Sequence, residues 1–500
     1  MNAWKFQITI NANSFCIARI EDFTIQPNRI LLLFGESGIG KTMLSKAVYG
    51  LLDTEELQVE INGYPYSKYA GSEFVQKIQS TGFFVFQEPS SHLNPVLKIG
   101  DQLSEGILGH GQIAEQDKEL LWKSPVDKTF DNLQDIYPQP FRPSGGEKQR
   151  LLLTMAMRKL NLYLQSEQTE QSGLFVFDEP SGSLDDELRN RFLNLLLQKF
   201  TQKPFTCLII THDYSIIGEI YRKYQQIVSR FDFKELYKDE DKLAVRPFEA
   251  GAYLNWISGV KGSQSSIKAN GQPVLQFGNR FRVFNRSMGI FKDKGYQQPV
   301  DLIIHSGEIV YLKAASGVGK TTLAKIIMGL YRSDHFNMNL AGLSVSEKTS
   351  AKVWLKKIWG HKAGMVFQHA DEALDLQADV YHIFKGLPGI RINRKVLIQE
   401  LQRLFENRID AAFLKKKVLF LSGGQKQRLN LLRVILLNTD LMILDEPLNG
   451  LDFNSIRKTL EIIRQEQQKG RAILIISHNE EIFDSFIEQD RIYYLAALKD

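Results

Sequence analysis

The sequence is poor in cysteine, which limits the kinds of site it can build. Only Cys16 and Cys207 occur among its 500 residues. Two cysteines so far apart cannot supply a four-cysteine zinc or iron–sulfur site, and they give no sign of a disulfide-rich secreted fold. Cys207 lies in the apolar run CLII, which favours a small core residue over a reactive thiol.

Long apolar runs are also missing. No stretch approaches the roughly 18 apolar residues that a membrane-spanning helix needs. The N-terminus, MNAWKFQITINAN, alternates apolar and polar residues, so it predicts a strand rather than a signal peptide. The apolar runs that do occur are short, such as ILLLF, LFVF and AILII, and they predict strands buried on both faces of a mainly parallel sheet.

A strong charge of one sign is absent as well. The net charge is +5, which permits contact with an anionic membrane surface but does not indicate nucleic-acid binding. A chain of 500 residues is too long for one hydrophobic core, so at least two domains are expected.

Three motifs occur twice, in the same order. GESGIGKT at residues 35–42 matches AASGVGKT at 314–321, and PSGGEKQR at 143–150 matches LSGGQKQR at 421–428. FVFDEP ends at Pro180 and MILDEP ends at Pro447. This repeat predicts a first domain at 1–237, a linker at 238–272 with a Gly/Ser-rich part, and a second domain at 273–500. The first copy has an insertion near 160–173, which predicts a longer helix followed by a surface loop.

The first motif predicts a loop that binds phosphate. Small residues let backbone N–H groups surround the anion, a lysine neutralises its oxygens, and a hydroxyl holds Mg²⁺. Lys41 and Thr42 take these roles in the first copy, and Lys320 and Thr321 take them in the second. The loop lies between a predicted strand and a predicted helix, whose N-terminus favours anions.

An acidic pair follows each second motif. Asp178 and Asp445 end apolar runs, so we expect their carboxylates to reach the Mg²⁺ shell at the edge of the sheet. Glu179 and Glu446 come one residue later and can polarise an attacking water.

A histidine ends the next apolar run in each copy. A single histidine in such a place is more often a capping or core residue. Because His212 in CLIITHD and His478 in AILIISHN occupy matched positions, we assign both to the γ-phosphate region, where they would sense the state of the nucleotide.

Together these motifs resemble the nucleotide-binding domains of ABC ATPases, in which SGGQ is the signature segment. The resemblance implies an α/β fold with two tandem P-loop domains, each with a mainly parallel core sheet, an antiparallel β portion and a helical subdomain. It implies ATP and Mg²⁺ as cofactors, bound at two composite sites that pair one copy's phosphate loop with the other's signature. The implied nucleotide-binding residues are Gly35, Glu36, Ser37, Gly38, Ile39, Gly40, Lys41, Thr42, Ala314, Ala315, Ser316, Gly317, Val318, Gly319, Lys320, Thr321, Thr322, Ser144, Gly145, Gly146, Glu147, Ser422, Gly423, Gly424 and Gln425.

Other elements of the family can be matched to this sequence. Gln87 in FVFQEP and Gln368 in MVFQHA match the glutamine that touches Mg²⁺ or water and couples to partners. Asp185 and Asp452 match the aspartate of the D-loop. An aromatic residue that stacks on adenine is expected before each phosphate loop; Phe15, Phe291 and Tyr296 are candidates, and a core position is an equal alternative for them.

Within the family, the first copy is similar to the oligopeptide, dipeptide and nickel importer ATPases. GESG, QEPSSHLNP and Tyr137-Pro138 carry this likeness, whereas the second copy reads FQHADEALDL without Asn-Pro. The likeness implies an importer subunit for peptides, nickel or a metal chelate. Its partners would be two membrane permeases and a substrate-binding protein, at the cytoplasmic face of the membrane.

The two composite sites are expected to be unequal. Ala314 replaces the first loop glycine, Pro143 replaces leucine and Glu147 replaces glutamine, and all three fall in the site built on the second phosphate loop. Alanine is tolerated there if its φ is negative. Both sites are expected to bind ATP, with faster hydrolysis at the first.

Two alternatives remain open from sequence. An ABC-type translation factor also has two copies and no membrane span, but it carries a long charged helical linker, which residues 238–272 do not resemble. A fused sugar-importer ATPase is similar in length, although its second copy usually has weakened motifs.

Overall fold

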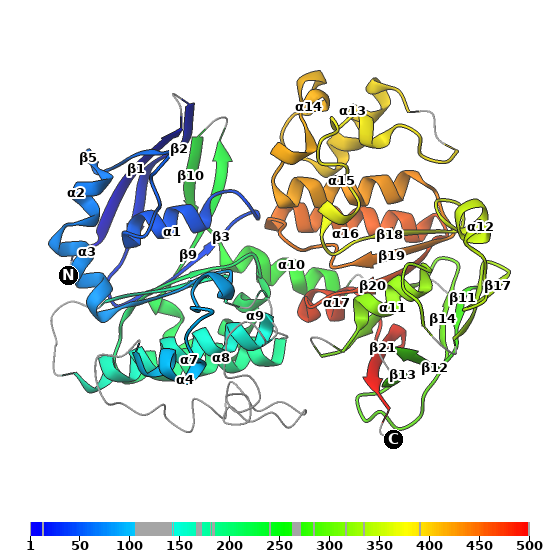
Figure 1. Ribbon diagram of the computed structural model, residues 1–500, viewed down its shortest axis with the longest axis horizontal. Coiled ribbons are helices and arrows are strands. Elements are labelled where there is room, and N and C mark those ends of the chain that lie inside the picture. The colour runs from blue at the N-terminus through cyan, green and yellow to red at the C-terminus, as the bar shows by residue number, and fades with distance from the viewer. Residues whose placement is uncertain are drawn as a thin grey trace. The chain divides into compact units, whose positions relative to one another are not determined.

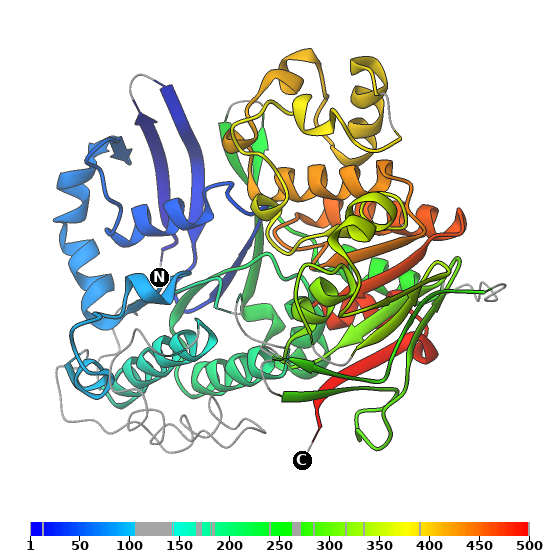
Figure 2. The same cartoon turned by 45° about the vertical axis from the view of Figure 1, so that its right-hand side comes forward.

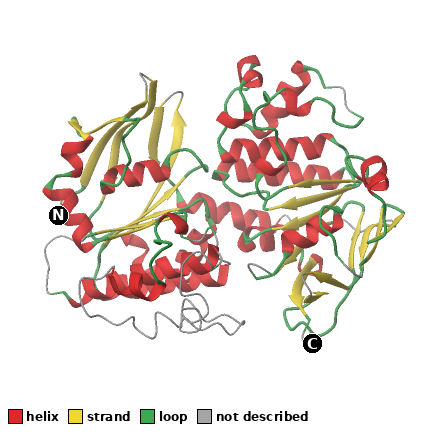
Figure 3. Cartoon of the chain, viewed as in Figure 1, coloured by secondary structure: helices red, strands yellow, loops and turns green. Residues whose placement is uncertain are grey.

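The computed structural model describes residues 2–12, 15–105, 143, 145–166, 173–180, 182, 186–239, 242–262, 272–283, 286–315, 318–333, 336–389 and 392–498. Contacts divide the chain into two compact units. The first holds Met1–Gly35 and Ile39–Tyr253; the second holds Glu36–Gly38 and Leu254–Asp500. Both combine helices with strands, as the colours of Figure 3 show, so the α/β class is confirmed.

The first unit is built around a six-stranded sheet in the order β10-β9-β3-β8-β7-β6. Only the pairing of β10 with β9 is antiparallel. Every residue of β3, β7 and β8 is buried, which explains why these strands are continuous apolar runs. The bounds are β3 (Ile30–Phe34), β6 (Phe83–Val85), β7 (Leu174–Asp178), β8 (Thr206–Ile210), β9 (Phe231–Asp239) and β10 (Lys242–Pro247).

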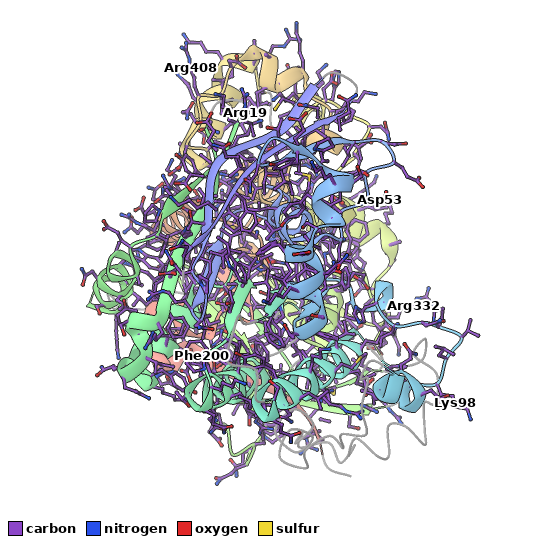
Figure 4. The ribbon with its side chains drawn as sticks, turned by 90° about the vertical axis from the view of Figure 1, so that its left-hand side faces the viewer. Arg19, Asp53, Lys98, Phe200, Arg332 and Arg408 are labelled. Carbon is purple, nitrogen blue, oxygen red and sulfur yellow. The ribbon has the colours of Figure 1, made fainter. Side chains whose placement is uncertain are left out.

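A smaller antiparallel sheet, β2-β1-β4-β5, completes the β structure of this unit. Ile8 of β1 lies opposite Ile20 on one side and Ile61 on the other, so the apolar residues share one face. Arg19, labelled in Figure 4, belongs to the exposed set that alternates with them. The bounds are β1 (Trp4–Ala12), β2 (Phe15–Ile25), β4 (Gln58–Ile61) and β5 (Tyr64–Pro65).

Helices cover the larger sheet of the first unit on both faces. In Figure 1, α1 lies on one side of β3, and α7 and α8 lie on the other. Phe200 of α8, labelled in Figure 4, is among the largest fully buried side chains. The bounds are α1 (Lys41–Tyr49), α2 (Tyr66–Ala70), α3 (Glu73–Thr81), α4 (Ile99–Glu105), α7 (Gly145–Gln165), α8 (Asp186–Gln202), α9 (Ser215–Lys223) and α10 (Ala250–Gly262).

The second unit repeats the plan with seven strands in the order β12-β13-β21-β15-β20-β19-β18. The five strands from β21 to β18 are parallel, and β13 pairs antiparallel with β21. The bounds are β12 (Arg280–Val283), β13 (Arg286–Phe291), β15 (Ile309–Lys313), β18 (Ala363–Val366), β19 (Leu441–Asp445), β20 (Ala472–Ile476) and β21 (Ile492–Ala497).

An antiparallel sheet and a set of helices surround these strands. In Figure 1, α15 and α16 lie on one side of β18 and β19, with α11 on the other, and the turned view of Figure 2 keeps this layering. The antiparallel sheet is β14 (Leu302–His305), β11 (Pro273–Phe277), β16 (Asn337–Leu340) and β17 (Leu343–Ser346). The helices are α11 (Lys320–Ile327), α12 (Ala351–Val353), α13 (Arg394–Leu404), α14 (Ala411–Lys415), α15 (Gly423–Leu436), α16 (Phe453–Gln468) and α17 (Glu480–Phe486).

Two regions of the sequence prediction can be compared with this fold. Helix α7 has 21 residues where its counterpart α15 has 14, so the predicted helix extension is present; the loop at 167–172 lies outside the described residues. The interval 238–272 contains β10 and α10, and residues 263–271 of it are not described. No helix in the described part of the chain has the length and apolar character needed to cross a bilayer.

Candidate functional site

Each phosphate loop joins the end of a central strand to the start of a helix. The loop after β3 leads into α1, and the loop after β15 leads into α11. Gly40 (φ 112°) and Gly319 (φ 113°) precede the helices, and neither helix has a side-chain N-cap. The first N–H groups therefore face the loop with no capping side chain, which suits an anion.

The loop lysines fold back over their own loops. Lys41 Nζ donates to the carbonyl oxygen of Gly35 at 2.8 Å, and Lys320 Nζ donates to that of Ala314 at 2.6 Å. Both lysines are buried, so each ammonium group is held inside the loop where phosphate oxygens would bind.

The first residue of the loop differs between the copies for a structural reason. Gly35 has φ 149°, and a Cβ built there would lie 2.6 Å from the carbonyl oxygen of Leu236, so glycine is needed. Ala314 does not have a positive φ, so the condition for tolerating alanine is met in the second copy.

Asp178 and Asp445 end β7 and β19 and are fully buried. Burial raises the pKa of each carboxyl to about 6, and the neighbouring loop threonine and lysine lower it less. None of the four carboxylate oxygens makes a well-aligned hydrogen bond within the described residues, although Thr42 and Thr321 lie near enough to lower the two pKa values. Buried oxygens of this kind fit a divalent cation, which prefers carboxylate and hydroxyl ligands.

Glu179 and Glu446 have an uncommon backbone conformation. Their φ angles are 48° and 49°, in the left-handed region that non-glycine residues rarely adopt. The N–H group of Glu179 donates to the carbonyl oxygen of Ile210 at 3.0 Å. The N–H group of Glu446 donates to the carbonyl oxygen of Ile476 at 2.8 Å. Strain of about 1–3 kcal/mol at two matched positions is typical of functional sites.

In the first unit, Glu179 lies among cations. Its Oε2 is 2.9 Å from Nδ1 of His212, and its Oε1 is 3.7 Å from Nζ of Lys41. Burial alone would raise the pKa of Glu179, but His212 and Lys41 outweigh it, so the pKa is lowered. Burial lowers the pKa of His212, whereas the neighbouring Glu179 carboxylate raises it. The net shift of the His212 pKa is upward. The pair is therefore held charged.

Glu446 has different neighbours. Ser477 Oγ donates to its Oε2 at 2.8 Å, and His478 Nε2 lies 3.6 Å from its Oε1. Burial raises the pKa of Glu446 to about 7, and the hydrogen bond from Ser477 only partly offsets this effect. The two glutamates thus share a backbone geometry but not an electrostatic environment.

The signature segments begin helices. In the second unit, Ser422 caps α15: its Oγ accepts from Gln425 N at 3.1 Å, and Gln425 Oε1 accepts from Ser422 N at 3.1 Å. This unit also contains Glu36, whose carboxylate accepts hydrogen bonds from Ser422 Oγ at 2.8 Å and from Arg428 at 2.7 Å. In the first unit, Gly145, Gly146 and Glu147 start α7.

The remaining predicted residues are placed as follows. Gln87 and Gln368 lie two residues beyond β6 and β18, which are the edge strands of the two larger sheets. Asp452 caps α16, because its Oδ1 accepts from Ser455 N at 2.8 Å.

Phe291 is buried in β13, whereas Tyr296 is exposed, which leaves Tyr296 the better placed aromatic residue in the second copy. Ser144, Asp185, Ser316 and Gly317 lie outside the described residues.

Several residues near the site were not predicted from sequence. Gln427, buried in α15, donates to the carbonyl oxygen of Glu446 at 3.2 Å, and Tyr311 donates to that of Ser477 at 2.9 Å. Arg189 pairs with Asp213, next to His212, at 2.6 Å. Of these residues, only Gln427 could have been noticed in the sequence, because it lies inside the repeated SGG motif. The other contacts depend on tertiary packing.

Comparisons with known proteins agree with this geometry. The ABC transporter family profile matches residues 19–170 and 297–449. The glutathione import ATP-binding protein of Pectobacterium atrosepticum is 23% identical, with 95% of this chain and 81% of that protein covered. The peptidoglycan transport ATP-binding protein YejF of Agrobacterium fabrum is 24% identical, over 91% of this chain and 84% of that protein.

A solved structure resembles the chain over nearly its full length. It is that of an archaeal ribosome recycling factor in complex with a ribosomal stalk protein, with a TM-score of 0.61 and 16% identity. The structural match covers 96% of this chain and 87% of the recycling factor. At such low identity it supports the fold alone. The family match extends over both phosphate loops, both SGG segments and the acidic motif of the second copy. The chain therefore belongs to the ABC transporter family, as an ATPase that carries two ATP-binding domains in tandem.

Proposed function

We propose that this chain is the energy-coupling subunit of an ABC importer and that it drives two separate membrane permeases. The observation that carries the proposal is one arrangement found twice: a loop lysine, an Asp-Glu pair at the end of a central strand and a histidine after the next strand. The importer subunits among its relatives support the direction of transport.

ATP would bind at two composite sites, each made from one copy's phosphate loop and the other copy's signature. One site would use residues 35–42 with 422–425, and the other would use 314–322 with 144–147. At each site the loop lysine, Lys41 or Lys320, would bind phosphate oxygens.

The chemistry assigned to the acidic residues follows from their positions. Glu179 and Glu446 would polarise the attacking water and accept its proton, and His212 and His478 would sense the γ-phosphate. Mg²⁺ would neutralise charge on the phosphate oxygens. The residues that would hold it are Thr42, Gln87 and Asp178 at the first site and Thr321, Gln368 and Asp445 at the second.

The proposed cargo is peptide-like. Two relatives are named for glutathione import and peptidoglycan transport, and both of those compounds contain peptide bonds. This supports peptides over the other sequence-based candidates, nickel or a metal chelate. Each permease would contact the chain near Gln87 or Gln368, and a substrate-binding protein would deliver the cargo.

A trapping experiment tests the proposal. The Glu179→Gln/Glu446→Gln double variant should bind ATP without hydrolysing it, and it should therefore stay bound to its permeases. Tagged double variant, purified from membranes of its own cells with ATP present, should bring down two multi-span membrane proteins. Co-sedimentation with ribosomes instead would support the translation-factor alternative and overturn the importer proposal.

A further inference from the structure

Ser477, which directly precedes His478, makes hydrogen bonds in three directions. It follows β20 and is buried. Its Oγ donates to Glu446 Oε2 at 2.8 Å and accepts from the N–H group of Asn479 at 3.1 Å. Its carbonyl oxygen accepts from the hydroxyl group of Tyr311 at 2.9 Å. Both the backbone and the side chain of Ser477 are thus fixed.

Tyr311 is a rigid support for this residue. It is fully buried in β15, where it lies opposite Ile475 of the neighbouring parallel strand β20. Its side chain therefore reaches along β20 to the carbonyl group beyond the end of the strand. A buried tyrosine hydroxyl needs a partner, and this carbonyl supplies one.

The hydrogen bond from Ser477 makes the two oxygens of the Glu446 carboxylate inequivalent, because only one of them accepts it. Oε2 is held by the Ser477 hydroxyl, whereas Oε1 is buried, accepts no hydrogen bond from the residues described and lies 3.6 Å from Nε2 of His478. A carboxylate fixed through one oxygen presents the other in a defined direction. That second oxygen is the one available to a water molecule.

The first unit lacks this arrangement in the contacts described. Thr211 occupies the position of Ser477, and its Oγ1 accepts from the N–H group of Asp213 at 3.0 Å. Leu32, at the position of Tyr311, has no hydroxyl to donate. Glu179 is held by His212 instead, at 2.9 Å.

We infer that Ser477 is a positioning residue of the second ATP site: it orients the Glu446 carboxylate toward the attacking water, and Tyr311 fixes Ser477. The inference rests on the proposed role of Glu446. Because Ser477 acts through Glu446, its loss should slow hydrolysis without weakening nucleotide binding.

The test isolates the second site in a Glu179→Gln background. Ser477→Ala should lower kcat by about tenfold, the effect of misplacing one charged group, while KM for ATP stays within about twofold. Ser477→Thr keeps the hydroxyl and should restore kcat to within about threefold of the background. Tyr311→Phe should cause a smaller fall in kcat, about threefold.

A matched control uses the first site. In a Glu446→Gln background, Thr211→Val should change kcat by less than about twofold, since no hydrogen bond from Thr211 to Glu179 is among the contacts described. An equal loss in Thr211→Val and Ser477→Ala would overturn the specific role of Ser477.

The outcomes separate this inference from the proposed function. If Glu446→Gln does not abolish turnover in the Glu179→Gln background, the proposed role of Glu446 fails. If it does, but Ser477→Ala leaves kcat unchanged or raises only KM, the inference about Ser477 fails. Should Ser477→Ala not fold, the decision passes to Ser477→Thr and Tyr311→Phe, and an unchanged kcat in Tyr311→Phe would count against the inference.

Discussion

The Nδ1 atom of His212 lies 2.9 Å from the Oε2 atom of Glu179, so imidazole and carboxylate form a close ion pair in the first unit. In the second unit the matched histidine lies 3.6 Å from Glu446, and a serine makes the close contact instead. The shift of the Glu179 pKa is downward and that of Glu446 is upward. The first glutamate is thus kept ionised more firmly than the second.

This difference predicts unequal effects of two matched substitutions. Glu179→Gln should lower steady-state ATP turnover by about 10²–10⁴-fold at its own site, because the proposed general base is lost. Glu446→Gln should remove a smaller share of total turnover, since the proposed second site would contain Ala314, Pro143 and Glu147. Rates of the two purified variants at saturating ATP measure the difference. Equal losses would contradict the asymmetry.

The buried aspartate of the first unit should destabilise the metal-free protein. Its pKa is raised from 3.8 to about 6, so folding favours the protonated form. The stability gained from burying the protonated carboxyl group is fully present below about pH 3.8 and is lost as the pH rises through 6. Asp178→Asn should therefore increase unfolding free energy at pH 8 by up to about 3 kcal/mol.

Calorimetry in EDTA at pH 8 and pH 4 provides the measurement. The gain in Tm for Asp178→Asn should shrink toward zero at the lower pH, and Asp445→Asn should behave in the same way. Both variants should lose ATPase activity. A variant less stable than wild type at pH 8 would show that other contacts stabilise the carboxylate.

The capping aspartate of α16 gives a local prediction. Asp452 accepts hydrogen bonds from both the N–H group and the hydroxyl of Ser455, at 2.8 and 3.0 Å. Asp452→Ala should lower the free energy of unfolding by about 1 kcal/mol. Asp452→Asn, which can still cap, should lose much less. Urea unfolding followed by circular dichroism compares the two, and equal losses would argue against a capping role.

An ion cluster around one buried lysine predicts a larger effect. Lys313, at the end of β15, donates to Glu480 at 3.0 Å and to Asp484 at 2.7 Å, both on α17. Lys313→Ala should lower the free energy of unfolding by about 1–2 kcal/mol, because two charge-assisted hydrogen bonds to a buried ammonium group are lost while solvent still screens the carboxylates.

An exposed ion pair in the same unit serves as the control. Lys325 contacts Glu372 at 2.9 Å with both side chains substantially exposed to solvent. Lys325→Ala should cost less than about 1 kcal/mol. The same urea titration applies, and a Lys313→Ala loss no larger than that of Lys325→Ala would rule out a special contribution from burial.

Much of the fold followed from the sequence because its signals are local. The apolar runs ILLLF, LFVF and AILII became β3, β7 and β20, and Asp178 ends β7 as predicted. The phosphate loops precede helices whose first residues are Lys41 and Lys320. Each short pattern alone would be weak evidence for its structural element. Their repetition in the same order made the prediction firm.

The environment of each glutamate could not be predicted in this way. The difference between Glu179 and Glu446 depends on a serine and a tyrosine whose partners lie on other strands. The left-handed φ of both glutamates has no sequence signal either, because the conformation is imposed by the surrounding strands. Tertiary packing decides both features.

The position before each phosphate loop is filled in two incompatible ways. Phe34 stacks on Tyr214 at 4.6 Å between ring centroids, whereas Lys313 joins two carboxylates of α17. Gene conversion that copied β15 alone into the first half would bury an ammonium group against an aromatic ring. The reverse exchange would leave two carboxylates facing a phenyl ring. The two strands are therefore not interchangeable between the halves, although each leads into a phosphate loop.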